Sequence, residues 1–222
     1  MSTFYVVATP IGNLEDMTLR AIRILKEVDL ILCEDTRVTK RLMDKYEIIN
    51  KTLSYHAQSE SVKTDLILDH ISNGKNIALV TDAGTPGISD PGSVLISQIR
   101  EKYPQVKVVA IPGPSALTAA LSIAGVPTHE FVFLGFMPHK KGRETLFREI
   151  AGSDRTIVFY ESTHRIIKTL ESLSGIKKKV TVVREITKIY EEVLQGMAED
   201  ILKTLTDNPE KQKGEFVVIV GG

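Results

Sequence analysis

Short apolar runs alternate with segments of helical periodicity along the first half of the chain. The apolar runs fall at residues 4–8, 29–33, 77–81 and 106–111, with a weaker one at 52–55. Between them, residues 18–28, 36–46 and 60–73 repeat apolar side chains every three or four positions, the period of an amphipathic helix. Strands that alternate with helices of this length predict a parallel sheet with helices on its faces.

The pattern changes after the segment Ile111-Pro112-Gly113-Pro114-Ser115. We expect a short Ala- and Leu-rich helix at 115–124, and further strands at 131–135, 155–160, 180–185, 189–195 and 215–220. Two of these strands are joined closely, which favours an antiparallel or mixed sheet. We therefore predict an α/β chain of two domains. Residues 1–112 form a mostly parallel sheet with flanking helices, and residues 113–222 form a mixed sheet with helices.

Composition narrows the possible classes of protein. Of the 222 residues 42% are hydrophobic, and 28 Lys and Arg balance 28 Asp and Glu, so no overall charge attracts nucleic acid. The one cysteine, Cys33, excludes an internal disulfide, and no Cys/His cluster has the spacing of metal ligands. The N-terminus lacks the basic and apolar regions of a secretion signal, and no run is long enough to span a membrane. We expect a cytoplasmic protein without membrane contact or bound metal.

The most informative loop follows the strand at 77–81 and is packed with Gly, Pro, Asp, Ser and Thr as far as residue 92. Ligands of open α/β sheets bind at the carboxyl ends of strands, and glycine lets a ligand approach the backbone. Asp82, Thr85, Ser89 and Asp90 bring hydrogen-bonding groups to that edge. The same composition suits a rigid turn between two elements, and the loop alone does not decide between a turn and a ligand site.

Four motifs in this order resemble the tetrapyrrole methylase superfamily. They are Val7-Ala8-Thr9-Pro10-Ile11-Gly12-Asn13-Leu14, Cys33-Glu34-Asp35-Thr36-Arg37, Thr81-Asp82-Ala83-Gly84-Thr85-Pro86 and Ile111-Pro112-Gly113-Pro114-Ser115-Ala116. The resemblance runs from Phe4 to Gly221. Tetrapyrrole-modifying members carry a glycine-rich turn at the position of residues 9–13, so the sequence is more similar to the branch that methylates small-subunit ribosomal RNA.

The resemblance implies both an activity and partners. It implies transfer of a methyl group from S-adenosylmethionine, bound in the cleft between the domains, to the ribose 2′-oxygen of a cytidine in 16S RNA. The partner is then small-subunit ribosomal RNA or the assembled small subunit, and the chain forms a homodimer. Two other functions stay open: methylation of a tetrapyrrole precursor, and a binding protein that has kept the cofactor fold but lost catalysis.

The resemblance also assigns the cofactor contacts. The turn at Gly84 and Thr85 faces the methionine half, and Asp82 is the candidate to hold the ammonium group because Thr85 stands where the superfamily has an acid. The full set is Pro10, Asp82, Gly84, Thr85, Ile88, Ser89, Pro112, Gly113, Ser115, Glu215 and Phe216. Plainer interpretations are an interdomain hinge for 112–115 and ordinary strand packing for 215–216.

Methylation of a ribose hydroxyl benefits from a base, because the pKa of the hydroxyl lies far above neutral. Alignment of the hydroxyl with the sulfonium supplies much of the rate. Glu34 and Asp35 follow one predicted strand and His56 follows another, so these three are the candidate catalytic residues. Alternatively, Asp35 or Thr36 caps the helix that follows, and His56 is a surface histidine.

Basic side chains are the candidates for RNA contact. Arginines grip phosphate through paired donors, and the loop His139-Lys140-Lys141-Gly142-Arg143 suits an RNA backbone. The predicted contacts are Arg37, Lys140, Lys141 and Arg143, with Arg165 and Arg184 as weaker candidates. A solvated charged loop is the commoner outcome for such a segment, and the family resemblance is what favours RNA.

Overall fold

The structure is a computed structural model that describes residues 2–56, 60–90 and 92–221. The chain divides into two compact units, residues 1–115 and 116–222. The boundary expected from the sequence, after residue 112, falls just before this division. In the described part of the chain, no helix is long and apolar enough to cross a membrane.

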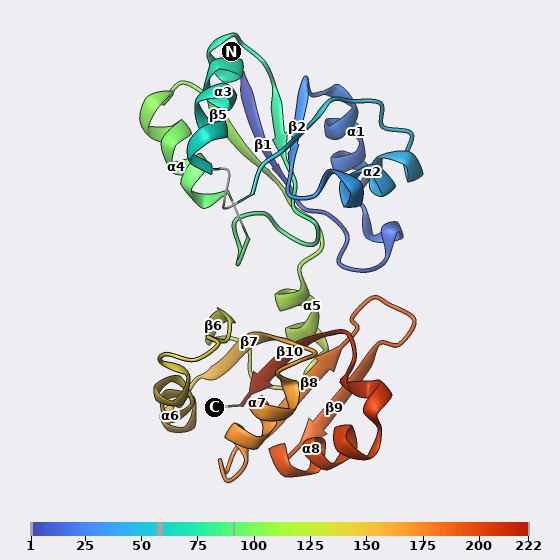
Figure 1. The fold of residues 1–222 in the computed structure, drawn as a ribbon, viewed down its shortest axis with the longest axis vertical. Helices are drawn as coiled ribbons and strands as arrows, with labels where there is room; N and C mark the ends of the chain where they lie inside the picture. The colour runs from blue at the N-terminus through green and yellow to red at the C-terminus, as the bar shows by residue number, and fades with distance from the viewer. Residues whose placement is uncertain (1, 57–59, 91, 222) are drawn as a thin grey trace. The chain divides into compact units, whose positions relative to one another are not determined.

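The first unit is built on a five-stranded sheet in which all neighbouring strands are parallel (Figure 1). Its strands are β1 (Thr3–Val7), β2 (Leu30–Cys33), β3 (Thr52–Ser54), β4 (Ile77–Leu79) and β5 (Lys107–Ile111). They lie in the order β3-β2-β4-β1-β5. Every residue of β2 and β4 is buried, as expected for central strands covered on both faces. The predicted parallel α/β sheet is confirmed.

Four helices cover the two faces of this sheet. They are α1 (Leu19–Glu27), α2 (Thr36–Lys45), α3 (Glu60–Ser72) and α4 (Ser93–Lys102), and a short 3₁₀ helix, η1 (Leu14–Asp16), precedes α1. Leu25 of α1 and Met43 of α2 share one core cluster with Ala78 of β4. Ile67 of α3 and Leu95 of α4 share the other. The pairs α1/α2 and α3/α4 therefore lie on opposite faces, as Figure 1 shows.

The connection after β4 leads to the opposite face of the sheet from the connections after both of its neighbours. β1 and β2 are followed by α1 and α2 on one face, whereas β4 is followed by α4 on the other. Such a reversal of direction opens a crevice at the carboxyl ends of the strands, the usual ligand site of open α/β sheets. The loop that follows β4 begins at Val80, at this edge of the sheet.

The second unit contains a mixed five-stranded sheet in the order β6-β7-β10-β8-β9. Its elements are α5 (Ala116–Ile123), β6 (Phe131–Phe136), α6 (Arg143–Gly152), β7 (Thr156–Ser162), α7 (Ile166–Leu173), β8 (Val180–Arg184), β9 (Glu192–Gly196), α8 (Ala198–Asp207), η3 (Pro209–Gln212) and β10 (Glu215–Val220). β6 and β7 pair in parallel and the other neighbours are antiparallel, which confirms the predicted mixed sheet.

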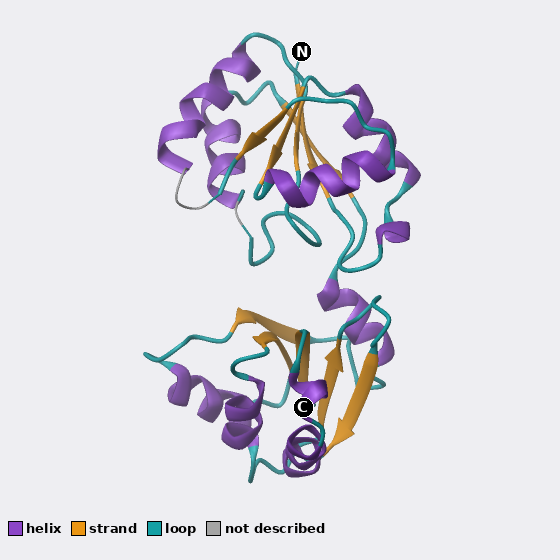
Figure 2. Cartoon of the chain, turned by 45° about the vertical axis from the view of Figure 1, so that its right-hand side comes forward, coloured by secondary structure: helices purple, strands orange, loops and turns teal. Residues whose placement is uncertain are grey.

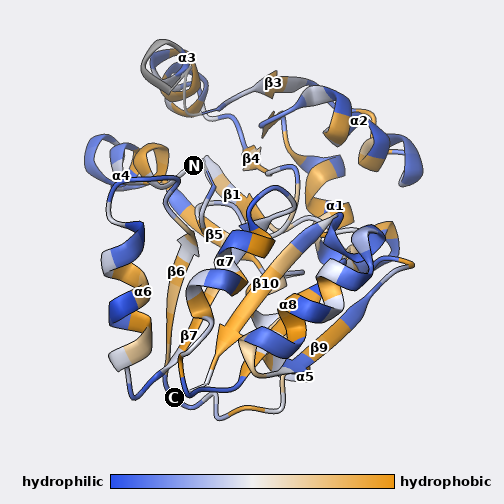
Figure 3. Ribbon diagram, turned by 60° about the horizontal axis from the view of Figure 1, so that its bottom comes forward, coloured by the Kyte–Doolittle hydropathy of each residue, from blue (hydrophilic) through white to orange (hydrophobic). Residues whose placement is uncertain are grey.

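Three helices, α6, α7 and α8, pack against one face of the second sheet (Figure 2). Their buried side chains, such as Phe147, Leu170 and Leu205, belong to one core cluster with residues of β10, whose residues from Phe216 to Val220 are all buried. β10 is accordingly drawn as strongly apolar in Figure 3. The predicted strand at 189–195 begins later, at Glu192, because a turn occupies the preceding residues.

Candidate active site

The carboxyl edge of the first sheet brings together three segments that the sequence assigned to the cofactor. Thr9 and Gly84 exchange backbone hydrogen bonds (N···O 2.9 and 3.1 Å), and the Thr9 hydroxyl donates to the Thr81 carbonyl (3.0 Å). The Thr85 hydroxyl donates to the Pro114 carbonyl (3.3 Å). Residues 8–11, 81–90 and 111–115 thus form one continuous edge within the first unit.

Glycine is required at two positions of this edge for the fold itself. Gly84 is buried at φ +86°, and its N–H and C=O are both bonded to Thr9. A Cβ on Gly113 would lie 3.0 Å from the Cβ of Ala8. The N–H and C=O of Gly84, which the sequence assigned to the methionine half of the cofactor, are therefore hydrogen-bonded within the edge itself.

The loop that leaves β4 is strained and partly open to solvent. Ser89 adopts φ +63°, a left-handed conformation that is uncommon without glycine and that clusters at functional sites. Ile88 is 47% exposed, and Ser89 is exposed beside it. Of the other predicted cofactor residues in this unit, Asp82, Pro112 and Gly113 are exposed, Thr85 and Ser115 are partly buried, and Pro10 is buried.

Three carboxyl groups, which we call the acidic edge (Glu34, Asp82 and Asp90), lie near one another at the carboxyl edge of the first sheet. Burial and the neighbouring Glu34 and Asp82 carboxylates raise the pKa of Asp90 to about 6, against a hydrogen bond from Thr81 that lowers it. Burial and the charge of Asp82 likewise raise the pKa of Glu34, while His56 lowers it. Asp90 therefore titrates close to neutral pH, which its sequence position alone did not reveal.

Asp35 has a different role from its two acidic neighbours. Its carboxylate accepts hydrogen bonds from the Arg37 backbone (2.8 Å) and guanidinium (2.6 Å), and it caps α2. The Arg37 side chain is the main cause that lowers the pKa of Asp35 to about 2. The backbone N–H of Asp35 also donates to Asp82 Oδ1 (3.0 Å). The capping interpretation is confirmed, and so acidic a carboxyl group is a poor proton acceptor.

Comparison with known proteins decides the family. A family model for tetrapyrrole (corrin/porphyrin) methylases matches residues 3–202. The chain belongs to the tetrapyrrole methylase family. The resemblance seen in the sequence motifs is thereby confirmed.

The methylase is similar over nearly its whole length to proteins named ribosomal RNA small subunit methyltransferase I. The Synechocystis protein is 43% identical over all of this chain and 80% of its own length. The Hydrogenobaculum protein is 46% identical over 97% of this chain and 94% of its own length. The Escherichia coli O157:H7 protein is 41% identical over 98% of this chain and 77% of its own length.

Solved structures share the fold at much lower identity. The methyltransferase CobJ matches with a TM-score of 0.71 at 21% identity, covering 100% of this chain and 95% of that one. Diphthine synthase also matches with a TM-score of 0.71, at 13% identity, covering 100% and 90%. These similarities confirm the tetrapyrrole methylase fold.

Two predicted cofactor residues of the methylase lie in its second unit, and their side chains are engaged there. Phe216 is 2% exposed and belongs to the core of that unit, and its backbone pairs with β7 and β8 on both sides. The Glu215 carboxylate pairs with Lys188 (2.8 Å). We therefore withdraw Phe216 as a side chain for the adenine, because core packing already occupies it.

The six predicted RNA-binding residues divide into two groups. Arg37, Lys140 and Lys141 are exposed, with 88% of the Arg37 side chain accessible. Arg143, Arg165 and Arg184 instead turn inward: the first two pair with Glu161, and Arg184 contacts Glu192 (3.4 Å). We correct the prediction for these three arginines, because their guanidinium groups are committed to partners within the unit.

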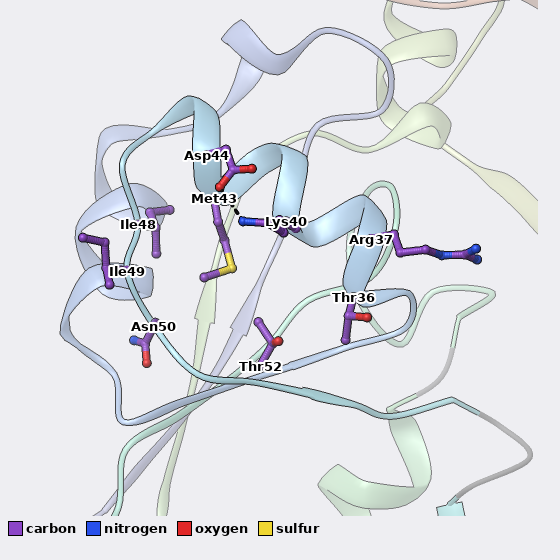
Figure 4. A pocket seen from close by; sticks show the side chains of 9 residues that line it. All are labelled: Thr36, Arg37, Lys40, Met43, Asp44, Ile48, Ile49, Asn50 and Thr52. Carbon is purple, nitrogen blue, oxygen red and sulfur yellow. Dashed lines mark hydrogen bonds and ion pairs between the residues drawn. The ribbon is translucent and has the colours of Figure 1, made fainter.

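A pocket of about 410 Å³ lies between α2 and the chain that leads into β3 (Figure 4). Arg37 and Lys40 supply positive charge at its wall, although Arg37 extends away from its centre, and Met43 points into it. Asn50 is held by hydrogen bonds to Leu25 and Val28 carbonyls. Nothing in the sequence pattern indicated this pocket, since it depends on how the helix packs beside an edge strand.

Proposed function

We propose that the chain transfers a methyl group from S-adenosylmethionine to the ribose 2′-oxygen of a cytidine in small-subunit (16S) ribosomal RNA. The observation that carries this proposal is the identity of 41–46% with ribosomal RNA methyltransferases across almost the entire chain. Solved structures of a cobalt precorrin-4 methyltransferase and a uroporphyrin-III C-methyltransferase share the fold at only 17% and 18% identity. That contrast favours RNA over a tetrapyrrole precursor as the substrate.

The acidic edge fits a cationic cofactor. S-adenosylmethionine supplies a methyl group on a positively charged sulfonium, and it also carries an ammonium group. The pKa values of Glu34 and Asp90 are raised partly because carboxylates crowd one another, and a nearby cation relieves that repulsion. Asp82, Thr85, Ile88 and Ser89, with the segment 112–115, are the proposed contacts. Pro10, which is buried at the same edge, is a further proposed contact.

Asp90 is the group best suited to take a proton from the ribose hydroxyl. A general base works best when its pKa lies near the working pH, and Asp90 meets that condition with a pKa of about 6. Glu34 is the second candidate, because its pKa is raised in the same direction. Asp35 instead positions Asp82 through its backbone N–H and holds Arg37 at the start of α2.

RNA contact is assigned to the exposed cations Arg37, Lys140 and Lys141. The chain carries no net charge, so phosphate must be bound locally. The protein is further proposed to be a cytoplasmic homodimer that acts on the free RNA or on the assembled small subunit. Sedimentation of the purified protein tests the dimer.

Tritiated methyl transfer distinguishes the candidate functions. The protein is incubated with labelled S-adenosylmethionine and either small ribosomal subunits, a tetrapyrrole precursor or no acceptor. Label in the ribosomal RNA supports the proposal, and label in the tetrapyrrole supports the other enzyme. Cofactor binding without any transfer to either acceptor identifies a binding protein that has lost catalysis.

A further inference from the structure

A buried carboxylate, Glu161, lies near the end of β7 and is 1% exposed. Its Oε1 lies 2.8 Å from Arg165 Nε and accepts a hydrogen bond from the Ser162 backbone (2.8 Å). Its Oε2 accepts from the Thr169 hydroxyl (2.6 Å) and lies 3.5 Å from Arg143 Nη1. One buried carboxylate thus pairs with two guanidinium groups away from water. Removing one partner of such a buried ion pair strongly destabilises the fold, because it leaves an uncompensated charge.

The same two arginines also hold the chain that follows β6. Arg165 Nη1 donates to the Met137 carbonyl (2.6 Å), and Arg143 Nη1 donates to the Pro138 carbonyl (3.3 Å). Each arginine side chain is only 15% exposed. Glu161 therefore fixes two guanidinium groups, and these groups fix two successive backbone carbonyls.

These carbonyls begin a short loop, residues 137–142, which we call the basic loop. Its far end is also fixed: the Arg143 backbone N–H donates to the Lys140 carbonyl (3.3 Å), and Gly142 adopts φ +85° to enter α6. Lys140 and Lys141 lie between these two attachments and are exposed. A loop ordered before binding loses less conformational entropy when it meets its ligand.

We propose that Glu161, Arg143 and Arg165 are positioning residues that hold the basic loop in the shape that presents Lys140 and Lys141 to RNA phosphates. This inference rests on the proposed function, because RNA is the ligand. The arginines do not touch the RNA. They act through the loop.

Direct contact by the arginines and positioning through the loop predict opposite effects for Glu161→Gln. If the arginines bound phosphate themselves, removing the neighbouring anion would leave two cations free to do so, and RNA binding would strengthen. If they position the loop, removing Glu161 loosens both guanidinium groups, and RNA binding weakens. The sign of the change therefore separates the two roles.

The experiment compares Glu161→Gln with Glu192→Gln, a control that removes a carboxylate from the Arg184 ion pair in the same unit. Two quantities are measured: the rate of limited trypsin cleavage after Lys140 and Lys141, and the affinity for transcribed small-subunit ribosomal RNA. We expect Glu161→Gln to be cleaved roughly 10–100-fold faster and to bind RNA about tenfold more weakly, as expected for the loss of charged hydrogen bonds that restrain a loop. The control should change either quantity less than about twofold.

If Glu161→Gln does not fold, a second variant, Arg165→Lys, tests the same inference. Arg165→Lys keeps a positive charge opposite Glu161, but an ammonium group cannot bridge to the Met137 carbonyl as a guanidinium does. It should show the same two changes with smaller size. Calorimetric titration with S-adenosylmethionine should give unchanged affinity for every variant.

A double-mutant comparison completes the test. When Lys140 and Lys141 are replaced by Gln, Glu161→Gln should no longer affect RNA binding, because coupled residues are not additive. Stronger RNA binding by Glu161→Gln, an additive effect, or unchanged cleavage would overturn the inference while leaving the proposed function intact. If the unaltered protein binds no RNA at all, the proposed function fails as well.

Discussion

Asp90→Asn removes the carboxyl group whose pKa is raised to about 6 in the folded protein. Folding raises the pKa of this carboxyl from 3.8 to about 6, so the folded state binds its proton more tightly than the unfolded chain does. Stability from this group is therefore fully present below about pH 4 and falls as the pH rises to about 6. The shift corresponds to roughly 3 kcal/mol, which solvent screening of a partly exposed group reduces to about 1 kcal/mol.

Asparagine removes that penalty because it carries no charge at any pH. At pH 8, Asp90→Asn should raise the free energy of unfolding by about 1 kcal/mol, whereas at pH 4 the two proteins should be nearly equal. Urea unfolding followed by circular dichroism at both pH values measures the difference. A charged residue whose neutralisation stabilises the protein is typical of a functional site, where activity is favoured over stability.

Methyl transfer supplies the second half of the test. With the unaltered protein, activity should rise with pH to about 6 and then level off, and Asp90→Asn should lose roughly 10²–10⁴-fold. Glu34→Gln is the matched variant, with a smaller loss expected. Activity of Asp90→Asn within a few-fold of the parent, together with no gain in stability at pH 8, would refute the assignment.

Three further predictions concern the basic loop, the helix cap and the strained turn. Replacing Lys140 and Lys141 by Glu should weaken RNA binding. It should also reduce the slope of log affinity against log salt concentration by roughly 0.7–0.9 per lost phosphate contact. An unaltered slope would mean that the loop is solvated and does not contact RNA. Asp35→Asn should keep the cap and leave methyl transfer within a few-fold, and a loss above 10²-fold would restore Asp35 as the base. Gly84→Val should lower the free energy of unfolding by roughly 1–2 kcal/mol, because Gly84 has φ +86°, where a β-branched residue is strained. Scanning calorimetry measures this, and a variant as stable as the parent would contradict it.

The sheet of the first unit was predictable because its apolar runs and helical periods are regular and local. The runs at 4–8, 29–33 and 77–81 became β1, β2 and β4 with ends shifted by a residue or two. No bounds were predicted for α6, α7 and α8, although Ile166, Leu170 and Leu173 recur at helical spacing in α7. The strand expected at 189 starts later because Glu185 and Thr187 take left-handed conformations in a turn.

Side-chain roles were harder to predict, since they depend on burial that sequence position does not record. Arg143 and Arg165 are arginines, which often bind phosphate, yet both pair with the buried carboxylate of Glu161, which is 18 residues from Arg143 in the sequence. Asp90 was recognisable as an acid in a loop, but its pKa is raised by burial and by the charge of Glu34, and neither can be inferred from its place in the sequence. Asp35 was predicted as a catalytic residue with helix capping as the alternative, and the capping contact could be foreseen because it is a local interaction.

The chemical identity of the methylated product is the sharpest test of the proposed activity. Small ribosomal subunits that lack the modification are incubated with the protein and S-adenosylmethionine, and their RNA is digested to nucleosides for mass spectrometry. We expect one 2′-O-methylcytidine per subunit, absent from reactions that lack the protein and strongly reduced with Asp90→Asn. A methyl group on a base, on another nucleoside, or on no RNA at all would contradict it.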